Sequence, residues 1–178
     1  MPESEARIRV NRAPVLTLWA AAVAERLGFE RDEALTLGRA LAGLTAHAKG
    51  VRLGIFEPSA PEEVRERRDQ LGAGERLEVH LMGRTIPVVR TPEGLRAVAK
   101  DQPTKPESVE RYLEGKFGDV LPEVRAAMER LAGSLPPAEL VRRAFRLYEG
   151  FRPAVPSGEA GWGKAGTLDL GRVTRLVR

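Results

Sequence analysis

The chain has 178 residues, enough for one domain, and 42% of them are hydrophobic, an ordinary fraction for a folded protein. It contains no cysteine, which excludes disulfides, thiolate catalysis and zinc–cysteine sites. A formal charge of +4 arises from 29 basic and 25 acidic residues, a mixed surface that permits nucleic-acid binding without favouring it.

The amide and proline content is also informative. The chain has one Asn, two Gln and 13 Pro, and 24 of its basic residues are Arg. Such a composition is typical of heat-stable proteins, although GC-rich coding also favours Arg over Lys. Residues 1–10 are polar and charged, with no signal peptide before the first predicted helix, so we expect a cytoplasmic protein.

Residues 11–56 predict a helical hairpin around which the rest of the chain is built. From Ala13 to Ala24 the only polar side chain is Thr17, so this helix should be buried on most sides. Asn11 is the expected N-cap. The apolar stretch is far shorter than the roughly 20 residues that span a bilayer.

The second helix of the hairpin is expected from about Asp32 to Gly50. Between Ala34 and Ala48 its only charged residue is Arg39, whereas a surface helix normally carries a charged face. Small residues four positions apart allow another helix to come close: Ala34, Gly38 and Ala42. Both helices therefore need cover, from the same chain or from a second copy.

Residues 59–90 predict a surface helix followed by a small β-hairpin. Ser59 and Glu62 form a capping-box pattern for a charged helix to about Leu71. Apolar residues alternate over 76–82, which indicates a strand, and Gly83 favours a type II′ turn into a second strand at 86–89.

Residues 91–152 predict a helical part. A short helix is expected from Thr91 to Lys100, and a capping box at Thr104 opens a second that Gly118 ends. Asp119 is the expected cap of the third, which buries Leu121, Val124, Met128 and Leu131. The fourth runs from 134–137 to about Phe151 with these side chains inward: Leu140, Val141, Ala144 and Tyr148.

Residues 153–178 predict a Gly/Pro-rich loop and a short terminal element, helical after Asp169. The segment 158–164 fits the spacing of a phosphate-binding loop, but Ala165 stands where a magnesium-binding hydroxyl is needed. No strand precedes it, so we favour a loop that buries Trp162.

A helix-turn-helix is an alternative for the hairpin, because Ala24 and Gly28 have the spacing that this motif favours. A reading helix presents hydrogen-bond donors to DNA near its N-terminus. Here that end carries Glu30, Asp32 and Glu33, which would repel DNA. A plain helical hairpin is therefore the favoured interpretation.

Antiparallel packing of the hairpin would bring several donors together in a candidate anion-binding cluster: Asn11, Arg12, His47, Lys49 and Arg52. The favoured alternative is that His47 and Lys49 only complement the negative end of their own helix. His47 and His80 have neither metal-ligand nor triad spacing, so we assign no catalytic residue, metal site or cofactor.

Arg142, Arg143 and Arg146 share the outer face of the last long helix. They are candidate contacts to nucleic-acid phosphates. The favoured alternative is an ordinary solvated helix face.

Three segments resemble an uncharacterised family of conserved bacterial proteins: NRAPVLTLWAA at 11–21, RYLEGKFGD at 111–119 and GWG at 161–163. The similarity covers most of the chain. It implies a bacterial, cytoplasmic setting and carries no activity, ligand or site.

We therefore predict a single domain, 1–178, with a mainly α (α+β) fold built around a buried N-terminal hairpin. The leading functional hypothesis is a non-enzymatic interaction module that self-associates as a dimer through the hairpin, on the uncharged face between Ala34 and Ala48. The alternatives are a nucleic-acid-associated protein that uses surface arginines and a binder or enzyme of a small anion at the Asn11–Arg52 cluster.

Overall fold

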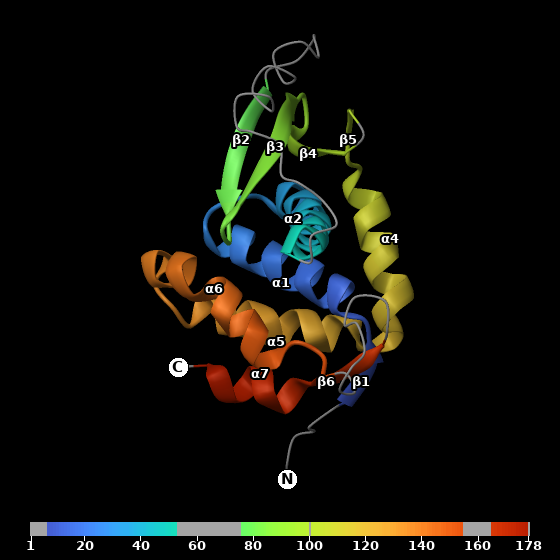
Figure 1. The fold of residues 1–178 in the computed structure, drawn as a ribbon, viewed down its shortest axis with the longest axis vertical. Helices are drawn as coiled ribbons and strands as arrows, with labels where there is room; N and C mark the ends of the chain where they lie inside the picture. The colour runs from blue at the N-terminus through green and yellow to red at the C-terminus, as the bar shows by residue number, and fades with distance from the viewer. Residues whose placement is uncertain (1–6, 53–75, 100, 155–164, 178) are drawn as a thin grey trace.

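The computed structural model describes residues 7–52, 76–99, 101–154 and 165–177, with the backbone alone for 47–52 and 76. It combines helices with two antiparallel sheets, and the predicted mainly helical α+β fold is confirmed (Figure 1). The predicted helix that ends near Leu71 and the glycine-rich segment 158–164 lie outside these residues. In the part of the chain that is described, no helix is both long and apolar enough to cross a membrane.

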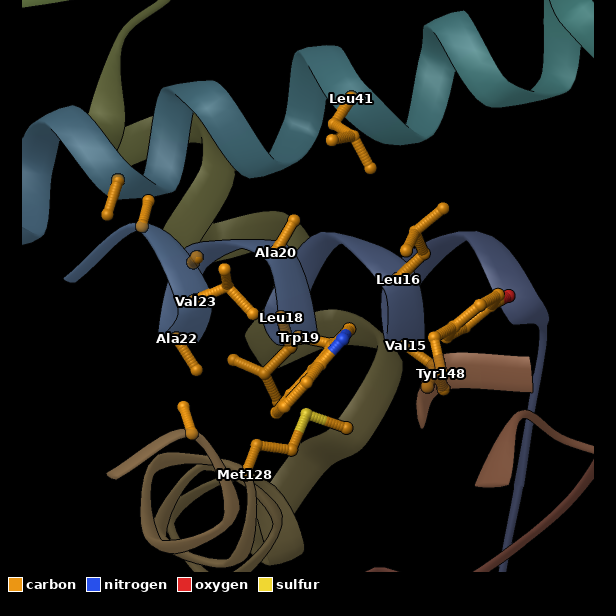
Figure 2. Packing of buried hydrophobic residues seen from close by; sticks show 14 of the residues in the cluster. Val15, Leu16, Leu18, Trp19, Ala20, Ala22, Val23, Leu41, Met128 and Tyr148 are labelled. Atoms are coloured by element: carbon orange, nitrogen blue, oxygen red, sulfur yellow. The ribbon is translucent and has the colours of Figure 1, made fainter. Parts of the chain in front are cut away.

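Helix α1 (Arg12–Arg26) is the centre of the core, as its apolar composition predicts. Every residue from Pro14 to Ala24 is buried. In Figure 1 it lies between α2 on one side and α5 and α6 on the other. Figure 2 shows Leu41 of α2 and Met128 of α5 approaching α1 from opposite sides. Each fully buried aliphatic side chain contributes about 1.5–3 kcal/mol, so this helix is a main source of stability.

Helix α2 (Arg31–Arg52) packs closely on α1, and the predicted hairpin is confirmed. The chain turns at Gly28, whose φ is +112°. At the point of closest approach a Cβ on Gly38 would lie 2.3 Å from the carbonyl oxygen of Thr17. The helix continues past the predicted cap at Gly50. Asn11 is the N-cap residue of α1 as predicted, although its side chain makes no cap hydrogen bond. Within α1 the hydroxyl of Thr17 donates to the carbonyl of Ala13 at 2.9 Å.

The predicted β-hairpin is part of a larger, four-stranded sheet in the order β2-β3-β4-β5. Its strands are β2 (Arg76–Leu81), β3 (Arg84–Thr91), β4 (Gly94–Ala99) and β5 (Gln102–Pro103). Met82 and Gly83 form the turn between β2 and β3, with φ of 48° and 79°. Two positive φ values indicate type I′ and not the predicted II′, and type I′ matches the twist of antiparallel strands.

The predicted helix from Thr91 to Lys100 is wrong, because this segment forms a turn and strand β4. Thr91 Oγ1 accepts from the backbone N–H of Glu93 at 3.2 Å and donates to the carbonyl of Gly94 at 2.7 Å. These local bonds close a tight turn in which Gly94 has a φ of +126°. Tertiary pairing with β3 then overrides the helical signal.

The remaining helices follow the predicted order. They are α4 (Pro106–Phe117), the 3₁₀ turn η1 (Gly118–Val120), α5 (Leu121–Gly133) and α6 (Pro137–Phe151). Gly118 ends α4 as predicted. The N-caps differ: Lys105 replaces Thr104, and Val120 replaces Asp119. The N–H of Thr104 instead bonds the carbonyl of Ala97 at 2.8 Å, which ties Thr104 to the sheet.

The two ends of the described chain pair with each other. Strand β1 (Arg7–Val10) is antiparallel to β6 (Gly166–Asp169), and helix α7 (Leu170–Leu176) follows β6. Asp169 caps α7 by accepting from the N–H of Gly171 at 2.9 Å, so the predicted terminal helix is confirmed. This small sheet and α7 lie on the side of α5 and α6 away from the four-stranded sheet (Figure 1).

Candidate functional site

The predicted anion cluster is only partly described. Arg12 is the first residue of α1, and its Nε donates to the carbonyl of Pro153 at 3.0 Å. Burial, followed by the nearby charge of Arg152, lowers the pKa of Arg12. His47, Lys49 and Arg52 occupy the last turns of α2, but their side chains lie outside the described atoms. The cluster therefore stays a prediction.

An ion pair engages one of the three arginines that were predicted to share the outer face of α6. Arg142 and Arg146 are exposed. Arg143 instead contacts Glu139 of the same helix, with an Nη1–Oε2 distance of 2.7 Å. The structure therefore leaves two of the three arginines on the outer surface.

A groove lies between the β2–β3 turn and α6. Its volume is about 490 Å³, and six of the residues that the structure describes line it: Met82, Gly83, Arg84, Val141, Arg142 and Phe145. Val141 is 55% exposed and is the large hydrophobic residue most open to solvent among those the structure describes. The groove thus places an uncovered aliphatic side chain in a concave surface.

One wall of the groove is α6, which α1 holds in place from behind. The buried indole of Trp19 donates from Nε1 to the carbonyl of Ala144 at 2.9 Å. Its ring also meets Phe151 edge-on, with centroids 5.4 Å apart. On the inner face of α6 the following residues are buried: Leu140, Ala144, Leu147, Tyr148 and Phe151. Because the inner face of α6 is packed in the core, the outer face of this helix is held in a defined position.

Arginines at both ends of α1 secure the segments that flank α6. Arg26 donates from Nη2 and Nε to the carbonyl of Leu135 at 3.1 and 3.3 Å, just before α6 begins. Arg12 bonds Pro153, just after α6 ends. The hydroxyl of the buried Tyr148 donates to the carbonyl of Arg12 at 3.5 Å. Burial raises the pKa of Tyr148, so it stays protonated and keeps this donor.

The other wall of the groove is the turn at Met82 and Gly83. Leu81, the last residue of β2, is buried and anchors the hairpin end in the core. Arg84, the first residue of β3, donates from Nε to the hydroxyl of Thr45 in α2 at 3.4 Å. This contact connects the turn to the central hairpin.

The lining chemistry suits binding and offers no acid–base catalyst. Met82, Val141 and Phe145 supply an apolar surface, and Arg84 and Arg142 supply positive charge. None of these described residues is a histidine, a carboxylic acid, a lysine, a tyrosine or a cysteine, the residue types that commonly act as general acids or bases. Within the residues that the structure describes, no group of acidic or histidine side chains is placed to hold a metal ion.

A second hollow lies between the start of α2 and α4, with a volume of about 430 Å³. The charge of one lining carboxylate, Glu110, is compensated within the protein. Arg125 donates to both oxygens of Glu110, at 2.7 and 3.0 Å, and Arg31 lies 3.9 Å from the same carboxylate. A carboxylate that is paired in this way is less available to a ligand, so we consider the groove beside α6 the better candidate site.

No family model, curated protein or solved structure matches the chain. The resemblance to an uncharacterised bacterial family stays a prediction. The candidate site therefore rests on the geometry of the groove.

Sequence reasoning found one of the six lining residues, Arg142, and assigned Val141 to the wrong side of its helix. The inner face of α6 is set by Leu140, Ala144 and Leu147. Val141 lies one residue from Leu140, about 100° further around the helix, and so turns outward. The spacing of the apolar residues in α6 was sufficient to predict that Val141 lies on the outer face. The groove itself could not be predicted, because the turn at Met82 that forms its other wall lies far away in the sequence.

Proposed function

We propose that the protein is a non-enzymatic interaction module that binds a partner protein in the groove between the β2–β3 turn and α6. The observation that carries the proposal is the 55% exposure of Val141 in a concave site beside Met82 and Phe145. Exposed apolar surface that is bordered by polar residues is typical of protein–protein interaction sites. We also place the module in the cytoplasm, which a chain without cysteine suits.

The rigidity of the groove supports this proposal. Trp19, Arg12 and Arg26 hold α6 and its flanking segments, and Leu81 holds the hairpin end. A surface that is already ordered loses little conformational entropy when it binds. More of the free energy from burying the apolar lining therefore remains as affinity.

Self-association through α2 is the alternative that the sequence favoured, because this helix lacks a charged face. Contacts within one chain are another explanation for that missing charge. Much of the uncharged surface of α2 is buried within the chain, because α1, α4, β3 and β4 pack against the helix. Among the buried residues are Ala34, Leu37, Leu41 and Ala42. On the outer side Gly43 and Ala46 remain exposed. A dimer through this remaining strip is the alternative to a single chain in solution, and a mass measurement distinguishes the two.

Nucleic-acid and small-anion binding also stay predictions. The pairing of Arg143 with Glu139 reduces the positive charge available on α6. Arg12 donates a hydrogen bond to the carbonyl of Pro153, so its side chain has a structural role in addition to any role in anion binding.

Site-specific photocrosslinking tests the proposed module. A benzophenone amino acid is placed at Val141, and at the exposed Glu114 of α4 as the matched control, in cells that naturally make the protein. We expect one discrete protein adduct from position 141 and not from 114. The identified partner, once purified, should bind the wild type and bind Val141→Glu at least about tenfold more weakly. Absence of an adduct, or identical adducts from both positions, would overturn the proposal.

A further inference from the structure

Two arginines from different helices meet where the start of α1 lies beside the end of α6. Arg12 is the first residue of α1, and Arg152 directly follows α6. The Nε of Arg12 donates to the carbonyl of Pro153, the residue next to Arg152, at 3.0 Å. The hydroxyl of Tyr148 donates to the carbonyl of Arg12 at 3.5 Å, and Figure 2 shows the Tyr148 ring beside the first turns of α1. These contacts bring the two residues together.

The two positive charges are not neutralised by an ion pair among the residues that the structure describes. The ion pairs found there involve neither Arg12 nor Arg152. Glu149, three residues before Arg152, is exposed and is paired with neither of them. Burial, followed by the charge of Arg152, lowers the pKa of Arg12. Two like charges held together on a partly buried surface oppose each other, so an anion bound between them would be favourable.

We propose that Arg12 and Arg152 together bind a small phosphate-type dianion, either inorganic phosphate or the phosphate group of a small molecule. Two guanidinium groups match the nearly two negative charges of a phosphate monoester at neutral pH. The planar fork of an arginine can also bond two phosphate oxygens at once. The bond to Pro153 engages Nε of Arg12 and leaves its two Nη groups for the ligand.

The second arginine distinguishes this site from the anion cluster that the sequence predicts. That cluster combines Arg12 with residues at the end of α2, whereas Arg152 follows α6 and lies far from Arg12 in the sequence. The site shares no described residue with the groove beside α6. Its occupancy is therefore independent of the proposed protein partner.

A purely structural role explains Arg12 better than it explains Arg152. The side chain of Arg12 holds the segment after α6 through its bond to Pro153. Arg152 contributes its backbone N–H, which bonds the carbonyl of Tyr148 at 2.7 Å, and its side chain makes no hydrogen bond to another described residue. The charge of Arg152 beside Arg12 thus has no structural function in the described part of the chain.

Titration with inorganic phosphate, followed by amide NMR spectra of the full-length protein, tests the proposed site. Sodium chloride keeps the ionic strength constant, and acetate and glycerol phosphate are titrated in parallel. Arg152→Gln removes the second charge without removing a described side-chain hydrogen bond. Arg146→Gln is the matched control, because it makes the same change at an exposed arginine of α6.

We expect saturable shifts of the amide signals of Arg12, Ala13 and Arg152 in the wild type. Arg152→Gln should weaken phosphate binding at least about tenfold, and Arg146→Gln by less than about twofold. Acetate, with a single charge, should bind at least about tenfold more weakly than phosphate. Tighter binding of glycerol phosphate than of inorganic phosphate would identify an ester as the ligand, and weaker binding would identify the free ion.

Melting temperatures separate a role in binding from a structural role. Without phosphate, Arg152→Gln should be as stable as the wild type or more stable, because the repulsion of Arg12 is removed. With phosphate, the wild type should gain stability that the variant does not gain, because a ligand that binds only the folded state stabilises it.

Four results would overturn the inference. They are no saturable shift in the wild type, equal affinity of the wild type and Arg152→Gln, equal weakening by both substitutions, and a lower melting temperature of Arg152→Gln without phosphate. Equal affinities would indicate a general effect of salt, and a lower melting temperature would indicate a structural role. None of these results changes the crosslinking expected at Val141, so failure of this site and failure of the proposed function are distinguishable.

Discussion

Gly38 shows how one missing side chain sets the distance between the two central helices. A Cβ at this position would lie 2.3 Å from the Thr17 carbonyl oxygen and 3.0 Å from the backbone nitrogen of Ala21. Both neighbours are backbone atoms of α1, which cannot rotate away. Glycine is therefore required by packing, although it is a poor helix former in isolation.

We expect Gly38→Ala to destabilise the protein by at least about 1–3 kcal/mol, because the helices must move apart in a packed core. Gly43→Ala on the same helix is the matched control, since a Cβ there meets nothing within 4 Å. That change should be neutral or stabilise by up to about 1 kcal/mol through helix propensity. Denaturant unfolding measures both, and equal stability of the two variants would contradict the proposed contact.

Glu110 provides a pH-dependent contribution at the residue scale. Its hydrogen bonds from Arg125 are the largest cause that lowers the pKa of this carboxyl. A lowered folded-state pKa contributes stability above the unfolded pKa of about 4.3, and that stability is lost as the pH falls through the folded-state pKa.

Glu110→Gln should therefore cost roughly 1–2 kcal/mol at pH 7, a difference from the wild type that shrinks in acid below about pH 4. Glu114→Gln, an exposed position of the same helix, is the control and should change stability by less than about 0.5 kcal/mol. Unfolding curves between pH 7 and about pH 3 supply the comparison. A difference that is constant over this range would count against the ion pair.

At the scale of elements, α2 completes the edge of strand β4. The carboxylate of Glu33 accepts from the N–H of Glu30 at 3.0 Å, at the start of its own helix, and from the N–H of Leu95 at 2.9 Å. The hydroxyl of Thr36 accepts from the N–H of Ala97 at 3.0 Å. Two edge donors of β4 are thus bonded by helix side chains and not by another strand.

Thr36→Val keeps the shape of the side chain and removes its acceptor. The buried N–H of Ala97 would then lack a partner, so we expect a cost of about 1–3 kcal/mol and faster hydrogen exchange at Ala97. Thr17→Val is the control: Thr17 is also fully buried, but its hydroxyl bonds only a carbonyl of its own helix. That change should cost less than about 1 kcal/mol. Similar losses of stability in both variants would show that the hydrogen bond between Thr36 and β4 contributes no more than the local hydrogen bond of Thr17.

At the scale of the whole molecule, the chain covers the hairpin that the sequence left without a charged face. The four-stranded sheet and α4 cover α2, and α5 and α6 cover α1 (Figure 1). Most of the apolar residues that are described in these two helices are therefore buried within one chain. Beyond the first turn of α2, the exposed residues among those with described side chains include Arg39, Gly43 and Ala46.

We expect light scattering at high micromolar concentration to give the mass of a single chain. A dimer mass would restore the hypothesis of self-association, and two exposed substitutions would then locate the contact. Ala46→Arg would dissociate a dimer built on α2, whereas Val141→Glu would dissociate one built on the groove, since a charge in an interface core costs affinity.

The predictions that the structure confirms depend on residues close together in the chain. The burial of α1 follows from the apolar run that ends at Ala24, and the close approach of the hairpin follows from Gly38. The end of α4 follows from Gly118. Composition and short-range periodicity determine such features, because burial of a continuous apolar segment is favourable whichever elements cover it.

Only the tertiary structure decided what surrounds the hairpin and where a partner would bind. Residues 94–99 form a strand because they pair with β3 and because Glu33 and Thr36, far away in the sequence, bond the other edge of that strand. The groove exists because Trp19 fixes α6 and Leu81 fixes the turn opposite Val141. These contacts join segments separated by long stretches of chain, and no local pattern specifies which pairs of segments meet.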